Sequence, residues 1–483
     1  MKTTKMATKF WVFVGAGLVV IALALLKLSP VMSTGLLALI LVSLIGVPLL
    51  IAKPQFGPAL IGFFLTFERV PSIEVGGISL RINFLLIVLS LVTFIFSKLV
   101  KKQLKIRFDP IRTASVVFIL LAIVSAAQAV NMSRALTVIV SLALMFCLYL
   151  VMSMVIEKKE DLILALKGLL WGALVAGIFG LYQFLGDMAG LSNSLTLLKV
   201  GYDSSTFGFA RVQAGSYEPL YFANYIFIPA FIIIFLNLSG TIKEAMSRRL
   251  SIAIGLLLAI NFVLAISRGA YLAAGVALVA LAVVQAKKII TLKNFVIVAL
   301  VGLFVVGGVY LALLKSQPRA LEEFIAHITV QDRENGESVV LRLSTSAQAI
   351  EFFWEKPILG VGPGNFGPAK EDYPTEAPDG GWPIVNNEYL EIAAEQGLVG
   401  IFGFLLLLAI IFAQVIATYR KVKDKLIANV ALALGFAFFA ILVQYLTFST
   451  LYITHIWYVI GLIGAVANIA NHNLSSHAKK SSS

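Results

Sequence analysis

The sequence predicts an all-α polytopic integral membrane protein with about 12–14 transmembrane helices and one large external helical loop. Three observations support this fold class. The 483 residues are 59% apolar and only 13% charged, a balance that leaves a water-soluble fold too few polar residues for its surface. Apolar runs long enough to cross a bilayer recur along the chain, and basic residues flank them on alternate sides. This composition excludes a soluble enzyme and a disordered chain. A disulfide scaffold is excluded as well, because the single Cys147 cannot form an internal bridge.

A hydrocarbon core of about 30 Å requires roughly 20 apolar residues per helix. On that scale the predicted spans are 10–27, 33–52, 55–67, 80–97, 113–130, 134–156, 162–186, 218–238, 251–266, 270–286, 294–314, 396–419, 426–446 and 452–470. Phe, Leu, Ile and Val fill these segments without strict alternation, which favours helices over a transmembrane barrel. The segment 55–67 is short and is a candidate for a re-entrant segment.

The net charge of +13 indicates orientation rather than a nucleic-acid partner. Most Lys and Arg residues fall at the termini and in short loops that follow even-numbered spans, for example at 98–112, 243–249 and 420–425. Since basic loops stay on the cytoplasmic side, both termini are expected to be cytoplasmic in a bacterial inner membrane. The longer loops on the other side carry more acids than bases.

These patterns predict four parts of the chain. They are helices 1–11 over 1–314 with a medium external loop at 187–217, a large external loop subdomain at 315–395, helices 12–14 over 396–470, and a cytoplasmic tail at 471–483. The large loop contains a helical pattern from Leu341 to Trp354 that is expected to lie on the membrane surface.

Three arginines on the predicted outer face are candidates for a diphosphate site. Arg211 lies just before a span, Arg268 lies in a short hairpin between two spans, and Arg342 lies on the loop helix. Arginine is expensive to keep in an apolar setting, and its planar fork suits phosphate oxygens. The alternative is that each arginine reaches water or pairs with a nearby acid.

A second candidate cluster leads into the span at 396–419. Glu388, Glu391 and Glu395 are spaced i, i+3 and i+7, which places three carboxylates on one helical face. Asn387 and Tyr389 stand beside them. The alternative is an ordinary solvated entry to the helix.

These segments together resemble the O-antigen ligase and Wzy-type polymerase family. The resemblance rests on the SRGA hairpin at 267–270, the helix from Arg342 to Trp354 with its KPILGVGPGNF tail, and the run NNEYLEIAAEQGLVG at 386–400. The stretch from Arg211 to Tyr225 is a weaker match. The specific motifs cover roughly residues 205–405, and the first seven spans match only in hydropathy.

The resemblance implies a glycosyltransferase of the lipid-linked GT-C type, without metal or other cofactor. Such proteins transfer a glycan from undecaprenyl diphosphate to a glycan, lipid or protein acceptor at the outer face of the inner membrane, polymerising or ligating surface polysaccharide. Arg211, Arg268 and Arg342 would bind the diphosphate, and Arg342 would also act in catalysis. The residues expected to position the acceptor or the loop are Asn387, Tyr389, Glu218 and Asn365.

One position departs from the family pattern and leaves the general base open. The family motif opens with His, whereas this chain has Asn386, which can hydrogen-bond an acceptor hydroxyl but cannot take its proton. Glu388 is the first candidate base, ahead of Glu391 and Glu218. His455 is a further candidate, although a lone His at a helix end is more often structural. The missing His tilts the choice towards polymerase.

A transporter or flippase for a lipid-linked glycan or polar solute is the alternative from another class. It predicts inverted repeats and ionisable or broken helices near mid-membrane. The sequence shows few intramembrane charges and instead concentrates its polar residues in external loops.

Overall fold

A computed structural model describes ten segments of the chain, and every structural statement below refers to them. They are 46–70, 72–75, 78–103, 108–204, 209–284, 337–370, 375, 377–378, 381–449 and 451–481. The predicted spans 10–27 and 294–314, most of 33–52, and the first part of the large loop lie outside the described residues.

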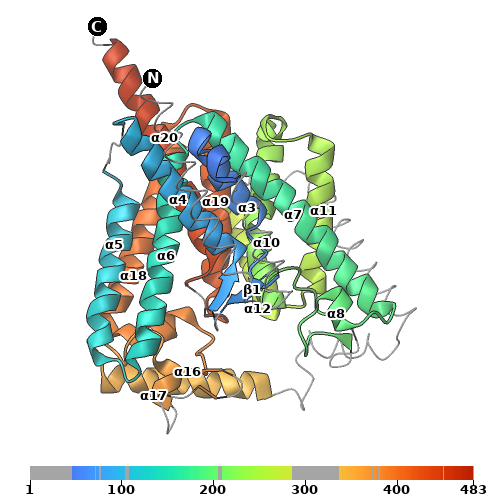
Figure 1. The fold of residues 1–483 in the computed structure, drawn as a ribbon, viewed down its shortest axis with the longest axis vertical. Helices are drawn as coiled ribbons and strands as arrows, with labels where there is room; N and C mark the ends of the chain where they lie inside the picture. The colour runs from blue at the N-terminus through green and yellow to red at the C-terminus, as the bar shows by residue number, and fades with distance from the viewer. Residues whose placement is uncertain are drawn as a thin grey trace, which may run out of the picture.

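The described chain is a helical bundle with one long helix lying across one end (Figure 1). Its main helices are α3 (Phe56–Phe63), α4 (Ile82–Val100), α5 (Pro110–Ser125), α6 (Met132–Val155), α7 (Lys159–Met188), α8 (Asn193–Thr196), α10 (Pro219–Ser239), α11 (Arg248–Leu264), α12 (Arg268–Val284), α16 (Glu337–Glu355), α17 (Phe366–Lys370), α18 (Glu388–Lys421), α19 (Lys425–Gln444) and α20 (Thr454–Ser481). In the described part, eight helices are long and apolar enough to cross a membrane. The all-α polytopic membrane class is therefore confirmed.

The predicted spans from 80–97 onward that are described each coincide with a helix, whereas the segment 55–67 does not form a full span. It contains α3, which has only eight residues. This helix packs on α7 where glycines allow close approach, since a Cβ at Gly168 or Gly172 would lie 2.1 or 2.2 Å from the carbonyl oxygens of Ala59 and Phe63. The chain then continues without helix to Glu68.

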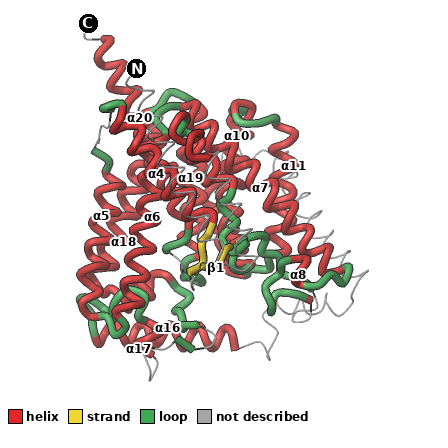
Figure 2. Tube along the Cα trace, viewed as in Figure 1, coloured by secondary structure: helices red, strands yellow, loops and turns green. Residues whose placement is uncertain are grey.

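A β-hairpin, which the sequence analysis does not predict, follows α3 (Figure 2). Strand β1 (Ser72–Val75) pairs antiparallel with β2 (Ile78–Arg81), so that Ser72 faces Arg81. Arg81 then forms the N-cap of α4. The hairpin is a small addition to an otherwise helical fold.

The basic loops meet at one end of the bundle, as the charge pattern requires. Lys98 at the end of α4 pairs with Glu157 at 2.6 Å, and Lys159 at the start of α7 pairs with Glu244 at 2.9 Å and Asp424 at 2.7 Å. These ion pairs join the end of α4 and the start of α7 to the segments that follow α6 and α10 and to the N-cap of α19. Figure 1 shows α16 and α17 across the opposite end, remote from the C-terminus.

Helix α18 is interrupted where the sequence analysis places the start of a span. Gly397 has φ 61° and ψ −158° inside the helix. A Cβ there would lie 2.4 Å from the carbonyl oxygen of Ile358, so both the backbone conformation and the close approach require glycine. The helical segment from Glu388 to Gln396 is thus separated from the spanning part of α18.

The α3–α7 contact gives a first prediction. Gly172→Ala should lower the free energy of unfolding by about 1–3 kcal/mol, because the added methyl meets backbone rather than a movable side chain. Gly275→Ala on α12 is the matched control, since no described atom lies within 4 Å of its Cβ position. Thermal unfolding in detergent measures both, and equal stability of the two variants would contradict the close packing.

A buried carboxyl joins the segment after α3 to two other parts of the chain. Glu68 is 4% exposed, its backbone N–H donates to the carbonyl of Gly215 at 3.1 Å, and its Oε1 accepts from the backbone N–H of Thr454 at 3.3 Å. Burial raises the pKa of Glu68 to about 7, although the bonds from Thr454 and the charge of Arg81 oppose the shift.

The raised pKa of Glu68 predicts a pH dependence of stability. A folded-state pKa above the unfolded one means that the native state holds the extra proton, so this stabilisation is complete below about pH 4.5 and is lost as pH rises to about 7. Glu68→Gln should remove that loss. Unfolding midpoints at pH 5 and pH 8 test it, and an identical pH dependence in both proteins would count against a protonated carboxyl.

Candidate functional site

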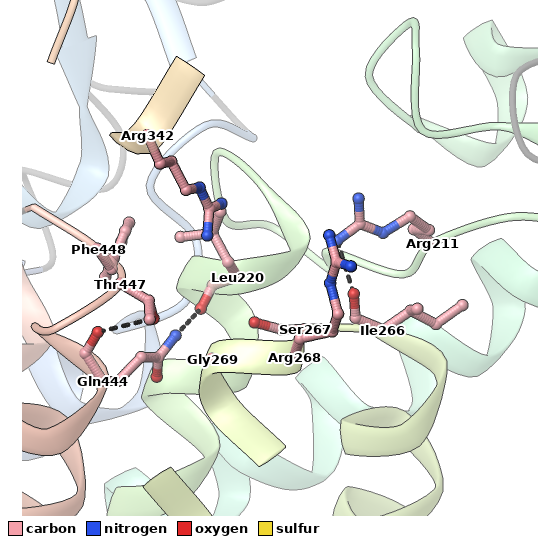
Figure 3. A pocket seen from close by; sticks show the side chains of 10 residues that line it. All are labelled: Arg211, Leu220, Ile266, Ser267, Arg268, Gly269, Arg342, Gln444, Thr447 and Phe448. Carbon is pink, nitrogen blue, oxygen red and sulfur yellow. Dashed lines mark hydrogen bonds between the residues drawn. The ribbon is translucent and has the colours of Figure 1, made fainter. Parts of the chain in front are cut away.

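The three predicted arginines line one cavity at the end of the bundle where α16 lies (Figure 3). Arg211 comes from the loop before α10, Arg268 is the first residue of α12, and Arg342 lies on α16. The cavity is open to solvent, and its volume is about 490 Å³ when the solvent space at its mouth is included. Its other lining residues are Leu220, Ile266, Ser267, Gly269, Gln444, Thr447 and Phe448.

Arg211 is held from below by the turn between α11 and α12. Its Nη2 donates to the carbonyl oxygen of Ile266 at 2.8 Å, and the guanidinium lies 5.6 Å from the centre of the Tyr202 ring. Ile266 has φ 47°, a left-handed conformation that turns its carbonyl towards the arginine. Burial lowers the pKa of Arg211, and the charge of Arg268 acts in the same direction.

The guanidinium groups of Arg268 and Arg342 have no hydrogen-bond or ion-pair partner among the described residues. Burial lowers the pKa of Arg342, and the nearby charge of Arg268 adds to the effect. Among the residues that the structure describes, no carboxylate lines the cavity, although the charge of Glu218 acts on Arg211 from nearby. Three guanidinium groups therefore share one space, and such a group of cations favours a bound anion.

The end of α19 forms the wall opposite Arg211. Gln444 is the last residue of that helix, and Thr447 donates from its hydroxyl to the Gln444 carbonyl oxygen at 3.1 Å. A Cβ at Gly269 would lie 2.0 Å from Oγ1 of Thr447, so glycine in the SRGA hairpin lets α12 approach this wall. Gln444 and Thr447 are not among the site residues predicted from the sequence. The only sequence signal for Gln444 is that it is an uncharged polar residue at the end of an apolar span.

The GVGPGNF segment forms a scaffold beside α18 and does not line the cavity. Glu395 accepts from the backbone N–H groups of Gly364 at 2.6 Å and Phe366 at 3.0 Å. Asn365 is fully buried, and its Oδ1 accepts from the backbone N–H of Asn131 at 2.6 Å. Asn365 thus positions the glycine-rich turn against the start of α6.

The three acids that begin α18 are buried, so the solvated alternative for them is wrong. Glu388, Glu391 and Glu395 are 4%, 7% and 7% exposed. Glu391 accepts from the backbone N–H of Val385 at 3.0 Å, as Glu395 does from the glycine-rich turn. Two of the three carboxylates therefore hold loop backbone in place.

Residues 387–389 contact the end of α19 and the segment that follows it, although none of the residues 386–389 lines the cavity. Asn387 caps α18, since its Oδ1 accepts from the Leu390 N–H at 3.2 Å. The backbone N–H of Glu388 donates to the carbonyl of Tyr445 at 3.0 Å, and the Tyr389 hydroxyl donates to that of Leu442 at 2.8 Å. Asn386 has φ 59° just before the cap.

The remaining candidates lie around the cavity rather than in its lining. Glu218 precedes α10 and pairs with Lys199 at 3.2 Å. His455 is buried near the start of α20, where its Nε2 lies 2.8 Å from Oδ1 of Asn224. The structure therefore brings the three arginines together and places the candidate bases in the surrounding layer.

Comparison with known proteins finds a family match for the part of the chain that includes Arg268 and Arg342. Residues 253–405 match the family model described as O-Antigen ligase. No curated protein matches the chain. The matched region contains Arg268, Arg342, the glycine-rich turn and the run that begins α18, whereas Arg211 and Gln444 lie outside it. Residues 253–405 are therefore similar to the O-antigen ligase family, in agreement with the resemblance of the sequence motifs.

Proposed function

We propose that the protein is a glycosyltransferase that takes its glycan from undecaprenyl diphosphate and that the arginine cavity binds the diphosphate. The observation that carries this proposal is the convergence of Arg211, Arg268 and Arg342 on one cavity, in whose lining the described part of the chain places no carboxylate. The similarity to the O-antigen ligase family supplies the reaction class, because such a reaction needs a lipid-linked glycan and an acceptor.

The arginines would stabilise charge that develops on the leaving group. When the bond between the sugar and the diphosphate breaks, negative charge grows on the diphosphate oxygens, and preorganised guanidinium groups lower the energy of that transition state. Arg342 is the strongest candidate for this role, because its guanidinium group has no partner among the described residues and can turn towards the anion. Arg211, fixed by Ile266, would set the position of the diphosphate.

The acceptor hydroxyl must lose a proton as its oxygen bonds to the sugar, and Glu388 is our candidate base. It is buried at the start of α18 and bonded through its N–H to Tyr445, the residue after the cavity-lining Gln444. Asn386 and Asn387 would position the acceptor hydroxyl or the loop, since an amide can donate and accept hydrogen bonds without taking the proton.

The cavity would face the outer side of the cytoplasmic membrane, with both termini in the cytoplasm. The basic loops lie at the opposite end of the bundle, where the positive-inside rule places the cytoplasm. Lipid-linked glycans displayed on the outer face would then reach the arginines, and a growing glycan, a lipid or a protein would serve as acceptor.

The position of the cavity favours transfer over transport. Arg268 begins α12 and Gln444 ends α19, so the cavity lies at helix ends rather than at the centre of the bundle. A transporter or flippase is expected to bind its cargo near the membrane midplane.

Removing Arg342 tests the proposal directly. Arg342→Ala should weaken binding of inorganic pyrophosphate by about 10- to 100-fold, the cost of one lost hydrogen bond to a charged group, and should abolish chain growth or transfer. Arg342→Lys should recover only part of the affinity, because lysine lacks the planar fork. Calorimetry on the full chain in nanodiscs, together with transfer from a defined undecaprenyl diphosphate oligosaccharide, measures both effects.

Arg249→Ala is the control, because this exposed arginine lies at the start of α11, at the end of the bundle opposite the cavity. It should leave affinity and transfer unchanged. Wild-type pyrophosphate affinity in the Arg342→Ala protein would overturn the diphosphate site.

A further inference from the structure

A chain of side-chain hydrogen bonds runs from the core of the bundle to the cavity wall. Nε2 of His455 on α20 lies 2.8 Å from Oδ1 of Asn224 on α10. Nδ2 of Asn224 donates to Oε1 of Gln444 at 2.9 Å, and Nε2 of Gln444 donates to the carbonyl oxygen of Leu220 at 3.3 Å. Figure 3 shows the Gln444 amide nitrogen turned towards Leu220.

The carbonyl of Leu220 fixes the direction of the whole chain. A backbone carbonyl only accepts hydrogen bonds, so Gln444 must present its nitrogen to Leu220 and its oxygen to Asn224. Asn224 must then present its nitrogen to Gln444 and its oxygen to His455, which donates from Nε2. Reversal of either amide would set two acceptors or two donors against each other in a buried site.

Burial makes this direction strongly preferred. Asn224 is 0% exposed, Gln444 1% and His455 2%. An unsatisfied polar group at such depth loses its hydrogen bond to water without replacement, so the side chains keep the one orientation that satisfies them all.

The amide nitrogen of Gln444 carries two hydrogens, and only one is used by Leu220. Gln444 itself lines the cavity with the three arginines. We infer that Gln444 donates its second N–H to the bound anion as a fourth ligand, and that Asn224 and His455 are positioning residues that keep its oxygen turned away. This inference rests on the proposed diphosphate site and adds a ligand to it.

The chemical consequence is a site whose side chains present donors. The arginine forks and the Gln444 N–H all point hydrogen atoms at one space, which suits a ligand with many acceptor oxygens. A diphosphate meets this requirement. With the Gln444 oxygen turned towards the cavity instead, the wall would repel such a ligand.

Substitutions at Gln444 test the proposed ligand. Gln444→Met keeps the size but removes the donor, and should weaken pyrophosphate binding by about tenfold. Gln444→Glu places a negative charge in the wall and should weaken binding further. Calorimetry with inorganic pyrophosphate on the full chain in nanodiscs gives the affinities, and thermal unfolding confirms that each variant is folded. Wild-type affinity in the folded Gln444→Met protein would overturn the inference.

A double-mutant cycle tests the positioning role. Asn224→Leu removes the bond to Gln444 without adding charge, and should weaken pyrophosphate binding less than Gln444→Met does. Because Asn224 acts only through Gln444, the double variant should bind as Gln444→Met does. If Asn224 had a purely structural role, Asn224→Leu would instead weaken pyrophosphate binding by the same factor in the wild-type and the Gln444→Met protein. Asn237→Leu is the control, since Asn237 lies on the same helix but bonds Ile233 and Ser251.

The outcomes separate this inference from the proposed function. If Arg342→Ala loses pyrophosphate binding while Gln444→Met keeps it, the diphosphate site stands and the fourth ligand is overturned. Full additivity of the Asn224 and Gln444 substitutions overturns the positioning role. If the Asn224→Leu protein does not fold, the order of affinity wild type, Gln444→Met, Gln444→Glu decides, and any other order overturns the inference.

Discussion

The gathering of three guanidinium groups around one cavity is the constraint on which the outer end of this protein depends. Like charges in a partly buried site repel one another and lose hydration, so the surrounding structure must hold them there until an anion arrives. Each arginine comes from a different element: Arg211 from the loop that bonds Ile266, Arg268 from the start of α12, and Arg342 from α16. The three positive charges that oppose folding at this end are therefore the same charges that would bind an anion.

The acids of the same end serve mainly as scaffold. Glu395 ties the glycine-rich turn to α18 through two backbone N–H groups, and Ser125 on α5 donates to the backbone carbonyls of Leu359 and Glu395. These bonds anchor the segment that follows α16, and α16 itself packs on α18. The position of Arg342 therefore depends on carboxylates that never reach the cavity lining. The buried acids thus support the loops, whereas the half-buried arginines line the proposed binding cavity.

The spans and the three arginines could be predicted from the sequence because their signals are local or topological. Hydropathy and loop charge locate helices and their ends, and they place Arg211, Arg268 and Arg342 on one side before any contact is known. The family motifs favour Arg268 and Arg342 as well, and both lie in the region 253–405 that matches the O-antigen ligase family model. The sequence already shows that the segment 55–67 is short, whereas the packing of α3 depends on the glycines of α7, some hundred residues later.

Other features depend on contacts between distant segments. Glu388, Glu391 and Glu395 form the predicted face, but only the packing of the glycine-rich turn and the loop after Gln444 shows that this face is buried. Gln444 looks like one polar residue at the end of an apolar helix until Asn224 and His455 are placed beside it. Asn386 stands where the family motif has a histidine, and the sequence alone does not identify the group that would take the proton of the acceptor hydroxyl.

The most direct test of the central claim is the position of a bound donor. Electron cryo-microscopy of the full chain in nanodiscs with an undecaprenyl diphosphate oligosaccharide should show the diphosphate within hydrogen-bond distance of Arg211, Arg268 and Arg342. Diphosphate density outside this cavity, for example at the groove lined by Lys158 and Lys167 at the opposite end, would contradict the account.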